Sequence, residues 1–196
     1  MSEPLAVPVA LQRGRPLGWW GMLVALATEG ALFGTMIASY FYLRFRTPEW
    51  PPRGTPEPRV LEPSLLTLLL VLTSVPTALA VWSARRQLAA RARTGLLATT
   101  VLASVYLAGV AWLLLDEWDK SPASKEAYDS LFFTLQGAHA AHVLLGVLVN
   151  LYLLVKISRR PLTQYRVNGV WAIGLYWHFV NALAVLVLLT TISPAL

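Results

Sequence analysis

The chain has 196 residues, of which 56% are hydrophobic and only 13% are charged, and it contains no cysteine. A water-soluble fold of this size needs more polar surface than these residues supply, so much of the apolar surface must face something other than water. The lack of cysteine excludes disulfides, thiolate metal sites and cysteine nucleophiles. The net charge of +6 does not indicate nucleic-acid binding, because the arginines stand between hydrophobic blocks instead of forming one basic face.

Five stretches are long and apolar enough to cross a hydrocarbon core, which takes about 20 helical residues. The sequence therefore predicts an all-α membrane protein, a single transmembrane domain over residues 1–196 built as a bundle of five helices. The expected spans are residues 19–43, 64–84, 96–115, 131–155 and 169–192. Pro76 in the second span lacks a backbone N–H and should kink that helix, with Thr73 beside it bonding a freed carbonyl.

The charges between the spans predict the orientation of the bundle. The N-terminus with the second and fourth loops holds ten basic residues and one acid, whereas the other side holds six basic and eight acidic residues. Because cytoplasmic loops carry the excess of Lys and Arg, we expect the N-terminus inside and the C-terminus outside.

One carboxylic acid lies within an apolar span. Glu29 stands ten residues into the first predicted span, which is about 15 Å deep and near the middle of the membrane. A charged side chain there costs about 2.5–3.5 kcal/mol, so we expect Glu29 to be protonated, paired or both. It shares a stripe at helical spacing with Ala25, Phe33, Met36 and Tyr40.

The fourth and fifth predicted spans each carry polar side chains spaced three or four residues apart and thus on one helix face. They are Gln136, His139, His142 and Asn150 on the fourth span, and His178 and Asn181 on the fifth. Measured from opposite membrane faces, His142 and His178 lie about 17 and about 14 Å deep, in the same layer as Glu29. The pattern favours one buried polar cluster.

Several interpretations of these residues are open from spacing alone. His139 and His142 at i, i+3 match a metal-ligand pair, but zinc needs three or four ligands and the further candidates are only His178 and Glu29. His142 and His178 could bracket a haem as axial ligands, making the chain a small haem-binding membrane anchor. Hydrogen bonding between helices is the commoner role of such histidines. A proton-coupled transporter using Glu29 is a further alternative, although the span count is odd and no inverted repeat is visible.

Three segments, in order, resemble subunit III of the haem–copper terminal oxidases. They are LATEGALF (26–33) continuing to YFYLR (40–44), then HAAHVLLG (139–146), then YWHFVN (176–181). The resemblance extends over nearly the whole chain. It corresponds to the five-helix bacterial form, which lacks the two N-terminal helices of the seven-helix members.

The resemblance implies an accessory subunit without a cofactor of its own, with haem and copper in partner subunits. Subunit I is the main implied partner, beside subunit II and other oxidase subunits, and membrane phospholipid is bound. The implied role is to stabilise subunit I and support its proton uptake during oxygen reduction coupled to proton pumping, in the bacterial plasma (inner) membrane. Relatives also occur in quinol oxidases and beside nitric oxide reductases. The matching histidines His139, His142 and His178 are structural in the family, and no residue is implied to be catalytic or to bind a metal.

Three other positions acquire roles from the resemblance. Glu29 matches the membrane-buried, carbodiimide-reactive glutamate of the family. Lys156 falls where relatives place a basic residue against a lipid phosphate, and a cation at a helix end suits that role. Asn181 departs from the family pattern, because relatives usually have Asp there, and a charge is therefore missing from the fifth helix.

Overall fold

The structure is a computed structural model that describes residues 17–52, 55, 58–120 and 126–195. Five helical segments are long and apolar enough to cross a membrane, and the described residues contain no strand. The predicted all-α membrane fold with five spans is therefore confirmed. The helices are α1 (Leu17–Arg46), α2 (Leu61–Leu72), α3 (Ser74–Arg85), α4 (Ala89–Lys120), α5 (Ala127–Arg159), α6 (Gln164–Ile192) and the short 3-10 helix η2 (Ser193–Ala195).

The helices extend beyond the apolar spans at both ends. The third span, expected over 96–115, is the 32-residue helix α4, about 48 Å long at 1.5 Å per residue. That length matches the full bilayer with its headgroup regions, about 40–45 Å, better than the hydrocarbon core alone. The orientation of the bundle stays a prediction, and Arg13 and Arg15, which contribute to it, lie outside the described residues.

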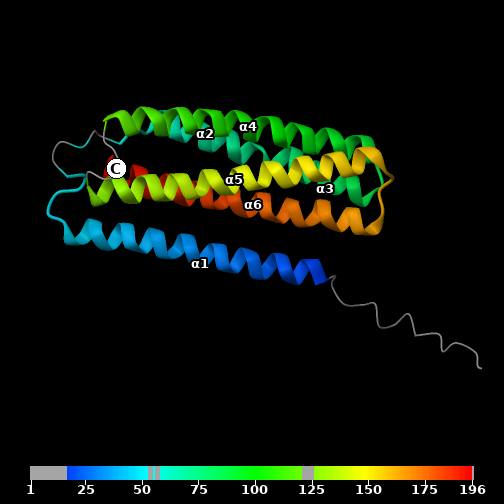
Figure 1. Cartoon of the computed structure of the whole chain (residues 1–196), viewed down its shortest axis with the longest axis horizontal. Coiled ribbons are helices and arrows are strands. Elements are labelled where there is room, and N and C mark those ends of the chain that lie inside the picture. The colour runs from blue at the N-terminus through cyan, green and yellow to red at the C-terminus, as the bar shows by residue number, and fades with distance from the viewer. Residues whose placement is uncertain (1–16, 53–54, 56–57, 121–125, 196) are drawn as a thin grey trace, which may run out of the picture.

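Helix α1 lies at one edge of the molecule (Figure 1). Among the described helices it packs on α5 and α6 alone, while α2, α3 and α4 cover the other side of that pair. Phe33 and Tyr40 of α1 are fully buried and pack with Leu135 of α5 and Leu183 of α6. Within the expected stripe, Phe33, Met36 and Tyr40 thus form the packing face of α1, whereas Ala25 is exposed.

The second span is divided at Thr73, between α2 and α3. Pro76 cannot donate a backbone hydrogen bond, and its ring crowds the carbonyl four residues earlier. The backbone N–H and the hydroxyl of Thr73 both donate to the carbonyl oxygen of Leu70, at 3.0 and 2.5 Å. The break lets α4 approach closely, since a Cβ atom on Gly95 would lie 2.7 Å from the carbonyl oxygen of Pro76. The break between α2 and α3 is therefore also a site of close packing against α4.

Arginine side chains tie the helix ends together. At one end Arg44 of α1 donates to the hydroxyl and the carbonyl oxygen of Ser193 after α6. At the other end the guanidinium of Arg93 in α4 donates to the carbonyl oxygen of Ile157 from Nη2 at 2.7 Å and Nε at 3.1 Å. A cation at the C-terminal end of α5 also complements the negative end of that helix dipole.

Candidate functional site

The structure brings Glu29 of α1 and His142 of α5 together near the middle of both helices. His142 Nε2 lies 2.7 Å from Glu29 Oε2, and His142 Nδ1 lies 2.7 Å from the carbonyl oxygen of Ala138. A carbonyl oxygen only accepts, so Nδ1 carries a proton and donates it. The short contact between Nε2 and Oε2 needs a second proton, held by either partner. The pair therefore stores one proton inside the membrane without a net charge.

This pair lies beside aromatic side chains and is partly exposed. The Phe33 ring stands edge-on to the His142 ring with 5.2 Å between centroids, and the Tyr176 hydroxyl donates to the His142 carbonyl oxygen at 2.8 Å. The Glu29 side chain is 35% exposed and the His142 side chain 16% exposed. The carboxyl group is consequently partly accessible from outside the bundle, beside the contact between α1 and α5.

His139 belongs to a different hydrogen-bond network. Its ring is fully buried, with Nε2 at 3.2 Å from the carbonyl oxygen of Val180 in α6 and Nδ1 at 3.0 Å from the hydroxyl of Tyr106 in α4. Nε2 must donate to the carbonyl, which leaves Nδ1 to accept from Tyr106. Tyr106 was not singled out from the sequence, although a tyrosine inside an apolar span needs a partner for its hydroxyl. One imidazole thus joins three helices.

The angular spacing on α5 explains why its polar stripe divides. Three residues advance an α-helix by about 300°, so His142 and Gln136 lie about 60° to either side of His139. Asn150 falls within about 20° of His139 and is fully buried, donating to the Leu96 carbonyl oxygen and the Thr100 hydroxyl. His139 and Asn150 therefore point into the core, while His142 faces α1 and Gln136 lines a cleft on the other side.

His178 does not join the Glu29–His142 pair. It is exposed at the middle of α6 and lies in a shallow groove whose other lining residues belong to α3: Ser74, Val75, Ala78, Leu79 and Trp82. His142 and His178 therefore have separate surroundings, which does not support axial ligation of one haem by the two rings. Among the described residues, no group of three or more His, Cys, Asp or Glu side chains could hold a metal ion.

Asn181, one turn after His178, is buried against the break between α2 and α3. Its side-chain amide donates to the hydroxyls of Ser74 at 2.7 Å and Thr73 at 3.2 Å. An ionised carboxylate at this position could only accept hydrogen bonds, whereas the Asn181 amide donates them. Asn181 is thus a neutral link between α6 and the kinked span.

Lys156 lies near the C-terminal end of α5 between two tyrosine rings. Its Nζ donates to the Tyr152 hydroxyl at 3.0 Å and stands 5.1 Å from the ring centroids of both Tyr152 and Tyr165. Within the described part of the chain, no carboxylate forms an ion pair with this ammonium group. An ammonium group has three N–H donors, so two are available to an anionic ligand.

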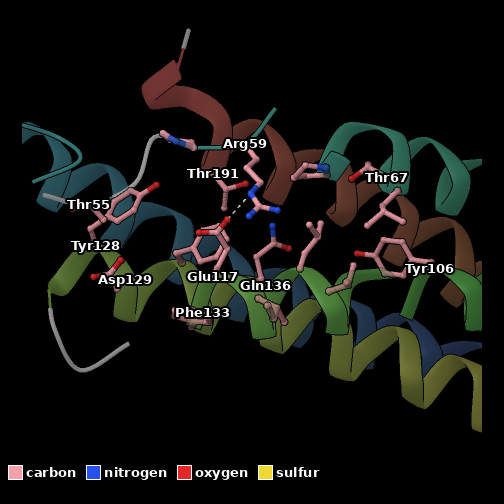
Figure 2. A pocket seen from close by; sticks show the side chains of 17 residues that line it. Thr55, Arg59, Thr67, Tyr106, Glu117, Tyr128, Asp129, Phe133, Gln136 and Thr191 are labelled. Atoms are coloured by element: carbon pink, nitrogen blue, oxygen red, sulfur yellow. Dashed lines mark ion pairs between the residues drawn. The ribbon is translucent and has the colours of Figure 1, made fainter. Parts of the chain in front are cut away.

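A second polar region lies at the opposite end of the bundle, around Arg59 (Figure 2). Arg59 forms ion pairs with Asp116 and with Glu117 of α4, the latter at 2.9 Å, and Asp116 also binds Lys120 at 2.6 Å. Partial burial disfavours the charge of Arg59, but its hydrogen bond to Asp116 and the nearby negative charges outweigh this and raise the pKa of Arg59. The arginine therefore stays charged at any ordinary pH. The sequence signal for this cluster is the run of acids that closes the third span.

In a comparison with known proteins, the family model for cytochrome c oxidase subunit III matches residues 10–193 of this chain. The chain is 30% identical over 171 residues to cytochrome c oxidase subunit 3 of Synechocystis sp., covering 86% of this chain and 72% of that protein. It is 28% identical over 173 residues to quinol oxidase subunit 3 of Bacillus subtilis, covering 84% and 79% of the two chains.

A third relative is the heme-copper oxidase subunit I+III of Aeropyrum pernix. It is 32% identical over 175 residues, which cover 85% of this chain and 21% of that much longer protein. The resemblance carried by three short segments therefore holds over nearly the whole chain, which belongs to the cytochrome c oxidase subunit III family.

Proposed function

We propose that this chain is an accessory subunit of a respiratory haem–copper oxidase of the bacterial plasma membrane, where it stabilises the catalytic subunit I and supports its proton uptake. Family membership and five membrane-spanning helices support this assignment. The name of the Aeropyrum pernix relative joins subunits I and III, which supports subunit I as the main neighbour. Subunit II and further oxidase subunits are the other expected partners, and haem and copper reside in the partners.

The Glu29–His142 pair is the observation that carries the proposal. An acid and an imidazole 2.7 Å apart share one proton at mid-depth, where an isolated charge would be costly. The pair joins the edge helix α1 to α5, and the Glu29 side chain is partly exposed. A proton held there can be exchanged with a neighbouring subunit without opening the rest of the bundle.

The position of His178 supports assembly with another membrane subunit. It stands fourteen residues from each end of α6, about 21 Å along the helix and thus near the bilayer midplane. Lipid chains offer no hydrogen-bonding partner at that depth. The imidazole and the apolar α3 stripe beside it therefore suit a transmembrane helix that carries a polar side chain at the same level.

Lys156 supports the binding of an anionic phospholipid. The two tyrosine rings hold the ammonium group at the end of the helix, and aromatic residues with basic side chains are typical of the membrane interface. A lipid phosphate would take the place of the missing carboxylate partner and accept the two remaining N–H donors.

The proposal is tested by purifying the complex in mild detergent through a tag on this chain. We expect the visible spectrum to show haem and mass spectrometry to identify a large multi-span subunit. Oxygen consumption is then followed to exhaustion for wild type and Glu29→Gln, which removes the ionisable group but keeps the size. We expect unchanged haem spectra and a shorter active lifetime in Glu29→Gln, because the amide cannot store the shared proton.

Thr28→Ala is the matched control, since the Thr28 hydroxyl is exposed and donates only to the carbonyl oxygen of Ala25 in its own helix. Equal active lifetimes for Glu29→Gln and Thr28→Ala would contradict the proposed role of the Glu29–His142 pair. Haem bound to this chain alone would instead favour a haem-carrying anchor, and purification without haem or partner would overturn the oxidase assignment.

A further inference from the structure

The cleft behind Arg59 runs from the end of the bundle into its interior (Figure 2). Its volume, counted as the space open to the centres of water molecules, is about 60 Å³, and it is lined by α2, α4, α5 and the end of α6. Arg59 and Glu117 form an ion pair at the mouth. Charged groups of this kind keep water at the entrance, because their hydration is strongly favourable.

Polar side chains continue along the cleft to the middle of the membrane. Thr67 lies six residues after the start of α2, Gln136 nine after the start of α5, and Tyr106 fourteen before the end of α4. The helix ends are not level, because Leu66 of α2 lies against Gly109 of α4. Thr67 is therefore close to the level of Tyr106, about 21 Å from the end of α4, and Gln136 lies nearer to Arg59 (Figure 2). The lining therefore offers hydrogen-bonding groups at successive depths, between apolar walls such as Leu66 and Val110.

Two of these groups have no hydrogen-bond partner within the described part of the chain. No described residue forms a hydrogen bond with the Thr67 hydroxyl or the Gln136 side-chain amide, although both line the cleft. A polar group left unpaired at membrane depth costs several kcal/mol, and such groups characteristically face a water-filled cavity. Water molecules that reach them would have two to four polar partners, as internal waters require.

The floor of the cleft is the hydroxyl of Tyr106, which also bonds His139. When this hydroxyl donates to His139 Nδ1, its oxygen is free to accept a hydrogen bond from water. We infer that the cleft is a water-filled vestibule that carries solvent from the Arg59 end of the bundle to the Tyr106–His139 pair at mid-depth. Solvent protons thereby reach a histidine that is otherwise sealed inside three helices.

The absence of cysteine from the chain allows a direct test by single cysteine substitutions in the assembled complex. Thr67→Cys and Gln136→Cys are treated with a membrane-impermeant, positively charged methanethiosulfonate reagent in spheroplasts and in inside-out vesicles. The thiolate that reacts forms in water and not in an apolar environment. We expect both variants to react from the Arg59 side, at least about tenfold faster than lipid-facing controls.

The controls are Leu65→Cys on α2 and Thr134→Cys on α5, which are exposed on the outside of the bundle and closer to the same helix ends. If depth alone determined access, these shallower positions would react faster than Thr67→Cys and Gln136→Cys. That order, or equal rates, would overturn the vestibule. Thr67→Cys is the primary variant, because a thiol replaces a hydroxyl of similar size and folding should be retained.

Discussion

Several polar side chains within the spans compensate for leaving water, each in a different way. Glu29 and His142 share a proton, His139 exchanges hydrogen bonds with Tyr106 and a backbone carbonyl, and Asn181 donates to two hydroxyls. Removing one partner leaves the other buried and unpaired, which costs about 1–3 kcal/mol. The loss of stability caused by a single substitution at these positions therefore includes the cost of the partner group that is left unpaired.

Lys156 gives a prediction at the level of one residue. Lys156→Gln removes the charge that we assign to a lipid phosphate, and a basic residue near the membrane surface contributes about 1 kcal/mol to anionic-lipid binding. We expect fewer phospholipid molecules per complex after detergent washing, measured by mass spectrometry. Arg159→Gln makes the same charge change at an exposed site on the same helix end, and an equal loss of lipid there would argue against a specific site at Lys156.

At the scale of helices, apolar length determines the five spans, and spacing identifies Phe33 and Tyr40 as the packing face of α1. Which neighbour a polar residue meets depends on the arrangement of helices, which hydrophobic periodicity does not contain. His139 and His142, three residues apart, therefore face different helices, and His178 faces outward. An uncertainty of about 60° around a helix is enough to move a side chain from one neighbour to the next.

The contact between α3 and α4 gives a prediction for packing. Gly95→Ala would place a methyl group 2.7 Å from the Pro76 carbonyl oxygen and 2.8 Å from the Ala80 Cβ atom, neither of which is a flexible chain end. We expect the free energy of unfolding to fall by about 1–3 kcal/mol, as in other overpacked cores. Thermal unfolding in mild detergent, followed by the fluorescence of the eight tryptophans, measures the change.

Gly34→Ala is the matched control, because a Cβ atom on Gly34 would meet nothing within 4 Å. Alanine is the better helix former by about 1 kcal/mol, so this variant should be as stable as wild type or slightly more stable. A similar loss of stability in both variants would show that the close approach of α3 and α4 at Gly95 is not what the substitution disturbs.

The whole molecule presents two distinct outward sites at membrane depth. The partly exposed Glu29 carboxyl lies against α5, and His178 lies in the groove beside α3. Helix α6 lies between α1 and α3 (Figure 1). The first can exchange a proton, whereas the second offers ring nitrogens without a partner within the described part of the chain. A subunit with these features is suited to be enclosed by neighbours on more than one side.

The groove at His178 gives a prediction for assembly. A photo-crosslinking amino acid at Leu79, which is 56% exposed in the groove, should form an adduct with another oxidase subunit in intact membranes. The same group at Leu148, which is 55% exposed on α5, serves as the control. We expect His178→Phe to lower the adduct yield from Leu79 severalfold and His178→Gln to retain it, because a hydrogen bond across helices contributes about 0.6–2 kcal/mol. Adducts with lipid alone, or equal yields from both positions, would show that this groove is not the subunit interface, while haem in the purified complex would still establish the oxidase assembly.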